Sequence, residues 1–374
     1  MPPAARTEGR HQVRTVGVEE ELLLVDPDSG DPKALAAAVL ARAAQDDPGQ
    51  EVFEKELFGQ MLEFATHPQS DMAALGDEIV RCRKEAARHA GQIGCGVAAL
   101  ATSPLPVSPA LSVNERYQWL AERYGVPTWD QLVCGCHVHV SVESDEEGVA
   151  VLDRLRPWLP VLRAVSANSP FWQGRNTGYA SYRSRVWNRW PSAGPTEPFG
   201  SAEEYHRRVA EMVATGVILD EAMVYFDARL SASYPTVEIR VADVCLGAEN
   251  AVLFATLVRA LVETTAREWR AGLPAPDPGV SLLRMADWQA ARYGIEEDLL
   301  DPVTLRPRPA PQVLRSLLEY TGDALTESGD AERAERAVAE LLRTGNGARE
   351  QRGLLERTGS LRDVVTECVR RTQC

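Results

Sequence analysis

The sequence predicts an α+β fold from two observations. Segments with the β-branched and apolar content of strands occur at 15–25, 51–66, 95–101, 134–143, 224–232 and 235–243. Helical periodicity of apolar residues occurs between and after them, at 34–45, 71–90, 148–167, 202–215 and 248–270, and twice more beyond residue 310. Strands separated by helices or by long irregular connections pack as layers of sheet and helix around a shared core.

The bulk composition narrows the class of protein. The chain has 374 residues and a formal net charge of -14, which argues against nucleic acid as a partner because phosphate binding needs a basic surface. Seven scattered cysteines differ from the dense, even set of a secreted disulfide scaffold, so we expect a cytoplasmic protein. No apolar run is long enough to span a bilayer, which predicts no membrane association.

Residues 1–14 are polar and predict a flexible leader. We expect a single catalytic domain over 15–374, with a helical C-terminal part from about residue 280, after the Pro-rich stretch GLPAPDPG.

The first predicted strand, TVGVEEELLLV, places Glu19 and Glu21 on one face and Glu20 on the other, because side chains alternate along a strand. Two carboxylates on one face repel each other, and removing them from water is costly. We expect a cation between them, and a hard divalent ion such as Mg²⁺ suits oxygen ligands. A solvated edge of an exposed strand is the alternative.

The next strand segment, FEKELFGQMLEFATHP, carries Glu56 and Glu63 among apolar neighbours. Glu63 lies between Leu62 and Phe64, a poor position for an unpaired charge. Their odd separation of seven residues places both acids on one face only if Gly59 permits a bulge or a turn. Glu63 is therefore the stronger candidate of the two.

The stretch CGCHVHVSV, residues 134–142, combines cysteines and histidines, the residue types that zinc prefers. In a strand, however, Cys134 and Cys136 share one face while His137 and His139 share the other, so the four cannot close around one ion. Free cysteines usually pack in the core. The two histidines are candidates for metal or anion contacts.

Residues 168–200 are rich in Gly, Pro, Trp and Arg and are too long and irregular for an idle connection, which predicts a functional loop. An extended conformation of YASYRSRVW would align Tyr179, Ser181, Arg183, Arg185 and Trp187 on one edge. Two arginines with a hydroxyl between them describe an anion clamp.

The strand PTVEIRVAD alternates Val237, Ile239 and Val241 with polar residues, so its other face presents Glu238 beside Arg240. This pattern suits a metal ligand next to a phosphate contact, and a cross-strand salt bridge would also explain it. The usual nucleotide-binding loop GxxxxGK[ST] is missing, as are GxSxG and HExxH.

Six motifs together resemble the carboxylate-amine ligase family of type 2 glutamate-cysteine ligases: GVEEE (17–21), MLEFAT (61–66), CGCHVHV (134–140), YASYRSRVWNRWPSAGP (179–195), TVEIRVAD (236–243) and ARYG (291–294). The resemblance implies a glutamine-synthetase-like fold, in which a curved, mainly antiparallel sheet forms a funnel flanked by helices. It also implies ATP as cosubstrate, Mg²⁺ or Mn²⁺ as cofactor, small-molecule carboxylate and amine substrates, and a homodimer.

Carried onto this sequence, the resemblance assigns metal binding to a group of acids and one histidine: Glu19, Glu21, Glu56, Glu63, Glu238 and His137. It assigns the transferred phosphate to Arg240, with Arg240 and His137 as the catalytic pair. It assigns ATP or substrate contacts to Arg240 and to residues of the motifs above: His139, Tyr179, Ser181, Arg183 and Arg185.

The implied reaction is ATP-dependent amide formation through an acyl phosphate, joining the γ-carboxyl of glutamate to cysteine or to another amine. Two alternatives remain open. Carboxylates with histidines also activate water in metal-dependent amide hydrolases. A degenerate homologue would bind nucleotide without turnover.

Overall fold

The structure is a computed structural model that describes residues 13–46 and 52–373. Most of the predicted leader, residues 1–12, lies outside this range. Arg14, at the end of that leader, is buried and pairs with Glu147 and Glu263. The packed part of the chain therefore includes this residue.

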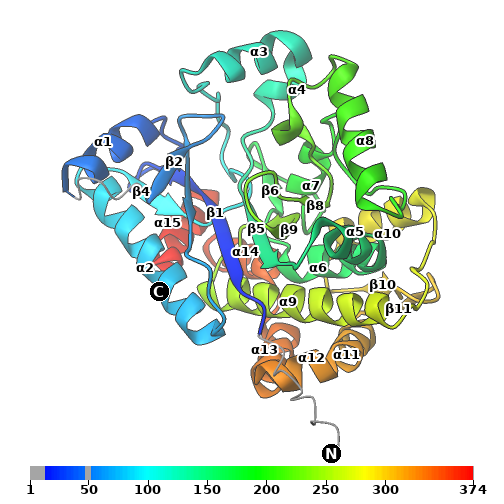
Figure 1. Ribbon diagram of the computed structural model, residues 1–374. Helices are drawn as coiled ribbons and strands as arrows, with labels where there is room; N and C mark the ends of the chain where they lie inside the picture. Colours follow the sequence, from blue (N-terminus) through cyan, green and yellow to red (C-terminus); the bar gives the residue numbers. More distant parts are fainter. Residues whose placement is uncertain (1–12, 47–51, 374) are drawn as a thin grey trace, which may run out of the picture.

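An antiparallel sheet occupies the centre of the molecule (Figure 1). Its strands follow the order β2–β3–β1–β5–β9–β8, and β4 pairs with the end of β1. Their bounds are β1 (Val16–Val25), β2 (Phe53–Lys55), β3 (Met61–Ala65), β4 (Gly96–Ala98), β5 (Gly135–Ser141), β8 (Ala228–Leu230) and β9 (Thr236–Asp243). Within the described residues β2 and β8 form the two edges, so the sheet is open. The predicted α+β fold with an antiparallel sheet is confirmed.

Helices cover one face of this sheet. The long helix α9 (Ala248–Arg270) contacts β1 and β5, and α2 (Met72–Gly91) and α6 (Leu159–Ser166) contact β1 and β9, respectively. Helix α9 is buried along most of its length because α5 (Asp145–Leu155), α12 (Gly322–Ser328) and α13 (Ala331–Thr344) pack on it as well. Figure 1 shows α9 running beneath the sheet with α11 (Ala310–Tyr320), α12 and α13 below it.

The other face of the sheet opens toward a group of shorter elements: α3 (Glu115–Tyr124), α4 (Val126–Trp129), α7 (Arg183–Trp187) and the 3₁₀ turn Glu221–Met223. Tyr124 Oη donates to the carbonyl of Val217, and Arg116 pairs with Asp220, so α3 is tied to the segment that follows α8 (Ala202–Ala214). This layer stands opposite the helices of the first face.

Several predicted elements differ in detail from the structure. The segment 51–66 forms two strands, β2 and β3, joined by a turn that contains Gly59. The helix predicted at 148–167 is divided into α5, a 3₁₀ turn (Arg156–Trp158) and α6, because Pro157 and Pro160 cannot continue a regular helix from the preceding turn. The strand predicted at 224–232 is reduced to β8.

The region from residue 280 contains mainly helices, and more of them lie beyond residue 310 than the two expected there. Helix α10 (Val280–Tyr293) is followed by a short hairpin of β10 (Asp298–Leu300) and β11 (Pro307–Pro309). Beyond α13, α14 (Gly347–Thr358) and α15 (Leu361–Thr372) return to the sheet, where α15 contacts β4. In the described ranges no helix is both long and apolar enough to cross a bilayer.

Candidate active site

The register of the sheet brings the predicted metal ligands together on its open face. Glu19 of β1 stands opposite His137 of β5, and Glu21 stands opposite Glu63 of β3. On the next strand, Glu238 of β9 stands opposite His139. Directly opposed residues in an antiparallel pair have Cβ atoms about 4.5–5.5 Å apart, so acids distant in the sequence become neighbours.

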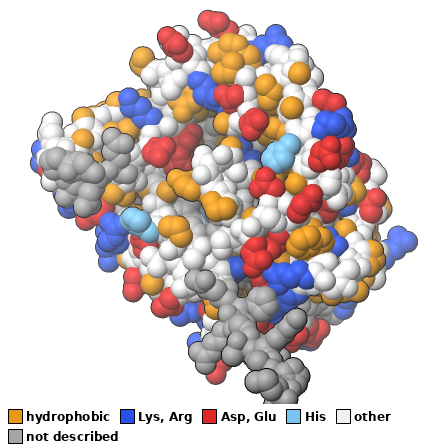
Figure 2. Space-filling model, in the orientation of Figure 1, with side chains coloured by type: hydrophobic (Ala, Val, Ile, Leu, Met, Phe, Trp, Pro, Cys, Tyr) orange, Lys and Arg blue, Asp and Glu red, His pale blue; other side chains and the backbone are white. Residues whose placement is uncertain are grey.

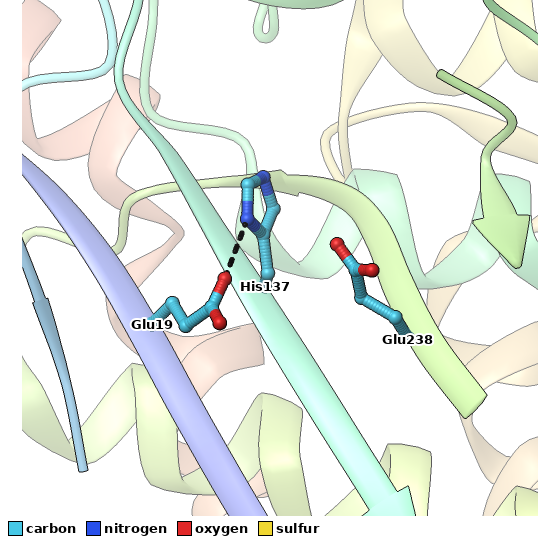
Figure 3. Close-up of side chains that lie close together, drawn as sticks. All are labelled: Glu19, His137 and Glu238. Atoms are coloured by element: carbon cyan, nitrogen blue, oxygen red, sulfur yellow. Dashed lines mark hydrogen bonds and ion pairs between the residues drawn. The ribbon is translucent and has the colours of Figure 1, made fainter. Parts of the chain in front are cut away.

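His137 stands at the centre of this group (Figure 3). Its Nδ1 lies 3.2 Å from a carboxylate oxygen of Glu19, while its Nε2 is buried and has no hydrogen-bond partner. Because the Glu19 carboxylate accepts, the neutral ring carries its proton on Nδ1 and leaves a lone pair on Nε2. A neutral imidazole held by a carboxylate in this way is the form that binds a metal ion.

Two sets of side chains could each hold a cation, and they share His137. One set is Glu19, His137 and Glu238, and the other is Glu21, Glu63 and His137. In each set the ligand atoms lie within 4.8 Å of one another. Carboxylate oxygens with one imidazole nitrogen suit Mg²⁺ or Mn²⁺, so the donor set fits a divalent ion.

These side chains line a cavity of about 410 Å³ between the sheet and the layer of short elements. Glu56 and Arg240 line it too, and Figure 2 shows this face of the molecule hollowed, with acidic side chains in the recess. A second cavity of about 950 Å³ shares Glu19, His139 and Tyr234 with the first. The two cavities therefore meet at the cluster of acids.

The chain is similar to known proteins along nearly its whole length. A model of the glutamate-cysteine ligase family 2 matches residues 15–367. The chain belongs to this family. Among its relatives, a protein of Streptomyces avermitilis described as "Putative glutamate--cysteine ligase 2-1" is 73% identical over 361 residues, covering 96% of this chain and all of the relative. A similarly named protein of Streptomyces coelicolor is 70% identical, with 96% and 99% coverage.

Solved structures show the same fold at low sequence identity. A glutamate–cysteine ligase of Francisella tularensis in complex with AMP aligns with a TM-score of 0.70 at 12% identity, covering 96% of this chain and 88% of that one. A bifunctional glutathione synthetase of Pasteurella multocida aligns with a TM-score of 0.72 at 16% identity, over 96% of this chain and 52% of that chain. The predicted family and fold are thus both confirmed.

In this member of glutamate-cysteine ligase family 2, the acids strongly affect one another's pKa values. Burial, followed by repulsion from Glu56, raises the pKa of Glu21 to about 7 against the opposing effect of Arg183. Desolvation raises the pKa of Glu63 well above its usual value, and the carboxyls of Glu56, Glu19 and Glu21 add to the shift. Such a cluster gains from an added cation, because a positive charge stabilises every ionised carboxylate around it.

The histidine and its partner shift in the opposite sense. Burial and the nearby charge of Arg240 lower the pKa of His137 to about 4, so its ring is neutral at pH 7. Burial alone would raise the pKa of Glu19, but hydrogen bonds from His137 and His139 outweigh it and lower that pKa below its usual value. Glu19 is therefore ionised beside a neutral imidazole.

Glu238 differs from the other acids because arginines hold it. Arg229 Nε lies 2.7 Å from its Oε2, and Arg240 pairs with its other oxygen. Burial raises the pKa of Glu238, but the charges of Arg240 and Arg229 lower it by more, so the pKa lies below its usual value. A cross-strand salt bridge, considered as the alternative for this pattern, is thus present between Arg229 and Glu238, in the same place as the possible metal ligand.

The structure corrects the extended conformation expected for 179–187, because Arg183–Trp187 forms the helix α7. Among the described residues, the lining of the acidic cavity includes Trp187 but not Tyr179, Ser181, Arg183 or Arg185. Ser181 Oγ donates to Asp243 at 2.8 Å, and Arg185 pairs with Asp287. Tyr179 Oη accepts from Trp288 at 3.2 Å.

Arg183 lies behind the acidic cluster. It is 1% exposed, and a Cβ on Gly135 would come within 2.3 Å of its Nη2, so a larger residue there would have to displace the guanidinium. Gly135 N in turn donates to Glu21. The guanidinium of Arg183 thus packs against the backbone of β5 at Gly135, and its Nε and Nη1 have no hydrogen-bond partner among the described residues. Its predicted role in binding ATP or substrate remains a prediction.

Sequence reasoning missed several residues that line the cavity, including Arg229, Arg116, Gln131, Trp190 and Tyr225. Arg229 could have been found, because strands β8 and β9 form a hairpin in which it stands opposite Glu238. The others come from α3 and from irregular segments, and no spacing rule relates these to the sheet.

Proposed function

We propose that the chain is an ATP- and Mg²⁺-dependent ligase that joins a carboxylate to an amine through an acyl phosphate. The observation that carries this proposal is the convergence of Glu19, Glu21, Glu63 and Glu238 around a neutral His137 in one cavity. The membership of glutamate-cysteine ligase family 2 and the AMP bound to the related Francisella enzyme support the use of ATP.

Either of the two sets that share His137 would hold a divalent ion, since the neutral imidazole offers a single lone pair. Bound there, Mg²⁺ would supply positive charge that offsets the phosphate oxygens of ATP and the surrounding carboxylates.

Arg240 is the group of this chain best placed to stabilise the transferred phosphoryl group. It is 7% exposed, lines the cavity and keeps its Nε without a partner. Glu238 orients its guanidinium by pairing with another of its nitrogens. A fixed, water-poor cation adjacent to the acids lowers the energy of the charge that develops during phosphoryl transfer.

For the substrates, we propose the γ-carboxyl of glutamate as donor and cysteine or another amine as acceptor. The description of the Streptomyces relatives as glutamate–cysteine ligases supports this choice of donor. The carboxylate attacks the γ-phosphorus of ATP, and ADP leaves with the electrons of the broken P–O bond, which gives the acyl phosphate. The amine then attacks the acyl carbon, phosphate leaves with the bonding electrons, and the nitrogen releases a proton.

The test is ADP release in the presence of MgATP, glutamate and a panel of amines. The wild type should release ADP only when both donor and acceptor are present. Glu63→Gln should reduce this rate by a factor of about 100 or more, as expected for loss of a ligand of the divalent ion. Glu211→Gln, on the exposed side of α8, is the matched control. Amide cleavage without ADP release would instead identify a hydrolase.

A further inference from the structure

The side of the acidic cavity that faces away from the sheet is lined by aromatic rings. The ring of Tyr225 lies 5.0 Å from that of Trp187 and 5.8 Å from that of Trp190, measured between centroids. Tyr117 and Leu120 of α3 line the same cavity. The open face of the sheet therefore meets an apolar and aromatic wall, which we call the aromatic subsite.

Two polar atoms in this wall, Gln131 Oε1 and Trp190 Nε1, have no hydrogen-bond partner among the described residues. Gln131 is 2% exposed and lines the cavity, and its Oε1 has no hydrogen bond. Its Nε2 donates to the carbonyl of Val186 at 3.0 Å. Because a carbonyl can only accept, this bond fixes the orientation of the amide, and Oε1 is the atom left to accept from another group. An unsatisfied buried acceptor is unfavourable, and a ligand that donates an N–H to it would remove this penalty.

The lining of the cavity carries six glutamates and only three arginines, although Arg240 Nε has no partner. Arg116 Nη2 lies 2.9 Å from Asp220, and Arg229 and Arg240 both pair with Glu238. Trp190 Nε1 is an unpartnered donor, but it is neutral and offers a single hydrogen bond. A buried carboxylate needs a counter-charge or several donors. The aromatic subsite consequently suits a ligand that has no carboxylate.

We propose that the aromatic subsite binds the acceptor substrate, and that this acceptor is a primary amine with an apolar or aromatic body and no carboxylate. The rings of Trp187, Trp190 and Tyr225 pack on the body, and Gln131 Oε1 accepts an N–H of the amine. Aromatic faces also favour a nearby ammonium group. This inference rests on the proposed ligase function and replaces cysteine as its acceptor.

The reaction of such an amine balances with the cosubstrates already proposed. The carboxylate and ATP give the acyl phosphate and ADP. The lone pair of the uncharged amine nitrogen forms the C–N bond, and the bond from the acyl carbon to the phosphate oxygen breaks. Phosphate leaves with that electron pair, and the nitrogen releases one proton to water, leaving an amide.

The experiment compares 2-phenylethylamine with L-phenylalanine, which differs only by an α-carboxylate, and with cysteine. Equilibrium binding to the full-length protein is measured by calorimetry, and turnover is measured as ADP release with MgATP and glutamate. We expect 2-phenylethylamine to bind about 100-fold more tightly than L-phenylalanine, as for a carboxylate buried without a partner. Its kcat/KM should exceed that of cysteine.

Gln131→Met tests the proposed acceptor atom. It should weaken binding of 2-phenylethylamine about tenfold, as for the loss of one buried hydrogen bond. Gln351→Met is the matched control, because Gln351 is also buried and donates through Nε2 to a backbone carbonyl, that of Asn168 at 2.9 Å, away from the cavity. Tyr225→Leu removes one ring and keeps an apolar side chain, and it should weaken binding as well.

Each outcome decides one of the two proposals. The aromatic subsite is wrong if 2-phenylethylamine does not bind at all. It is also wrong if the amine binds equally well to the wild type, to Gln131→Met and to Tyr225→Leu, whether or not ADP forms. If ADP release is faster with cysteine than with 2-phenylethylamine, the proposed ligase function is supported and the proposed acceptor is wrong. Specific binding of the amine without ADP release from any donor upholds the subsite and overturns the ligase.

Discussion

Successive glutamates of β1 point to opposite faces of the sheet, and the two faces hold buried charge in different ways. On the helix-covered face, Glu20 and Arg83 are both fully buried, and two bonds of 2.7 Å join them. Arg83 also donates to the carbonyls of Leu246 and Cys245. On the open face, Glu21 stands opposite Glu63, another acid.

The difference separates buried charges that stabilise the fold from buried charges that form the candidate active site. The pair of Glu20 and Arg83 is compensated within the protein, so nothing further is needed to keep it buried. The acids of the open face lack enough positive charge of their own and gain from a cation supplied from outside. The four predictions below test this contrast, from the largest expected effect to the smallest.

Removing Arg83 should cause the largest loss of stability. Arg83→Met leaves the Glu20 carboxylate buried without its partner, and we expect the free energy of unfolding to fall by about 3–5 kcal/mol. Denaturation with urea measures this change. Arg81→Met, on the same helix and half exposed, is the control and should change stability by less than about 0.5 kcal/mol. A loss in Arg83→Met as small as that of the control would show that the pair of Glu20 and Arg83 does not hold the fold.

Adding Mg²⁺ should stabilise the protein through the acids of the open face only. A ligand that binds only the native state at 100 times its Kd raises the free energy of unfolding by about 2.7 kcal/mol. The wild type and Arg83→Met should gain equal increments, because the helix-covered face does not touch the ion. Glu63→Gln should gain much less. If Glu63→Gln and the wild type gained the same increment, Glu63 would not be a metal ligand.

The raised pKa of Glu21 predicts an unusual dependence of stability on pH. Its pKa is about 7 in the native state and 4.5 in the unfolded chain, so the native state holds the proton more tightly. Its contribution to stability is present below pH 4.5 and is lost as the pH rises toward 7.

The neutral variant Glu21→Gln isolates this contribution, because His137 titrates in the opposite sense over part of the same window. Without divalent ions, the stability of the wild type relative to Glu21→Gln should fall by about 2 kcal/mol between pH 5 and pH 7.5, at about 1.4 kcal/mol per pKa unit. Mg²⁺ should abolish the fall, since it favours the ionised carboxylate. A difference that rises with pH in the absence of metal would contradict the assigned direction.

The alternation of side chains made much of this contrast predictable from the sequence. Because neighbouring side chains on a strand point to opposite faces, the separation of Glu20 from Glu19 and Glu21 followed from the strand assignment alone. The same rule separated Cys136 from His137, and Cys136 is indeed fully buried. The condition placed on Gly59 was met as well, since the turn there lets Glu56 hydrogen-bond to Glu63.

Contacts between distant segments could not be predicted in this way. The partner of Glu20 is Arg83, which lies on a helix 63 residues away, and no local pattern links the two. The segment 179–187 was assigned an extended conformation because its alternation of arginine with small residues resembles a strand. Tertiary contacts decide otherwise: Ser181 and Arg185 bond to Asp243 and Asp287 on β9 and α10. Such contacts depend on how whole layers pack, which a single sequence does not display.

The smallest effect should come from Glu54, which stands opposite Glu63 at the exposed edge strand β2. Like charges directly opposite each other in a sheet are destabilising by about 0.2–1 kcal/mol, so Glu54→Gln should raise the stability of the metal-free protein by that amount. The gain should shrink when NaCl is raised from about 0.05 M to about 0.5 M, because salt screens charges that face solvent. Urea denaturation at both salt concentrations measures it.

For the pair of Glu20 and Arg83, which has no contact with solvent, the loss in Arg83→Met should stay nearly constant over the same range of salt. Equal salt dependence at both positions would mean that the two faces of β1 do not differ in their access to compensating ions.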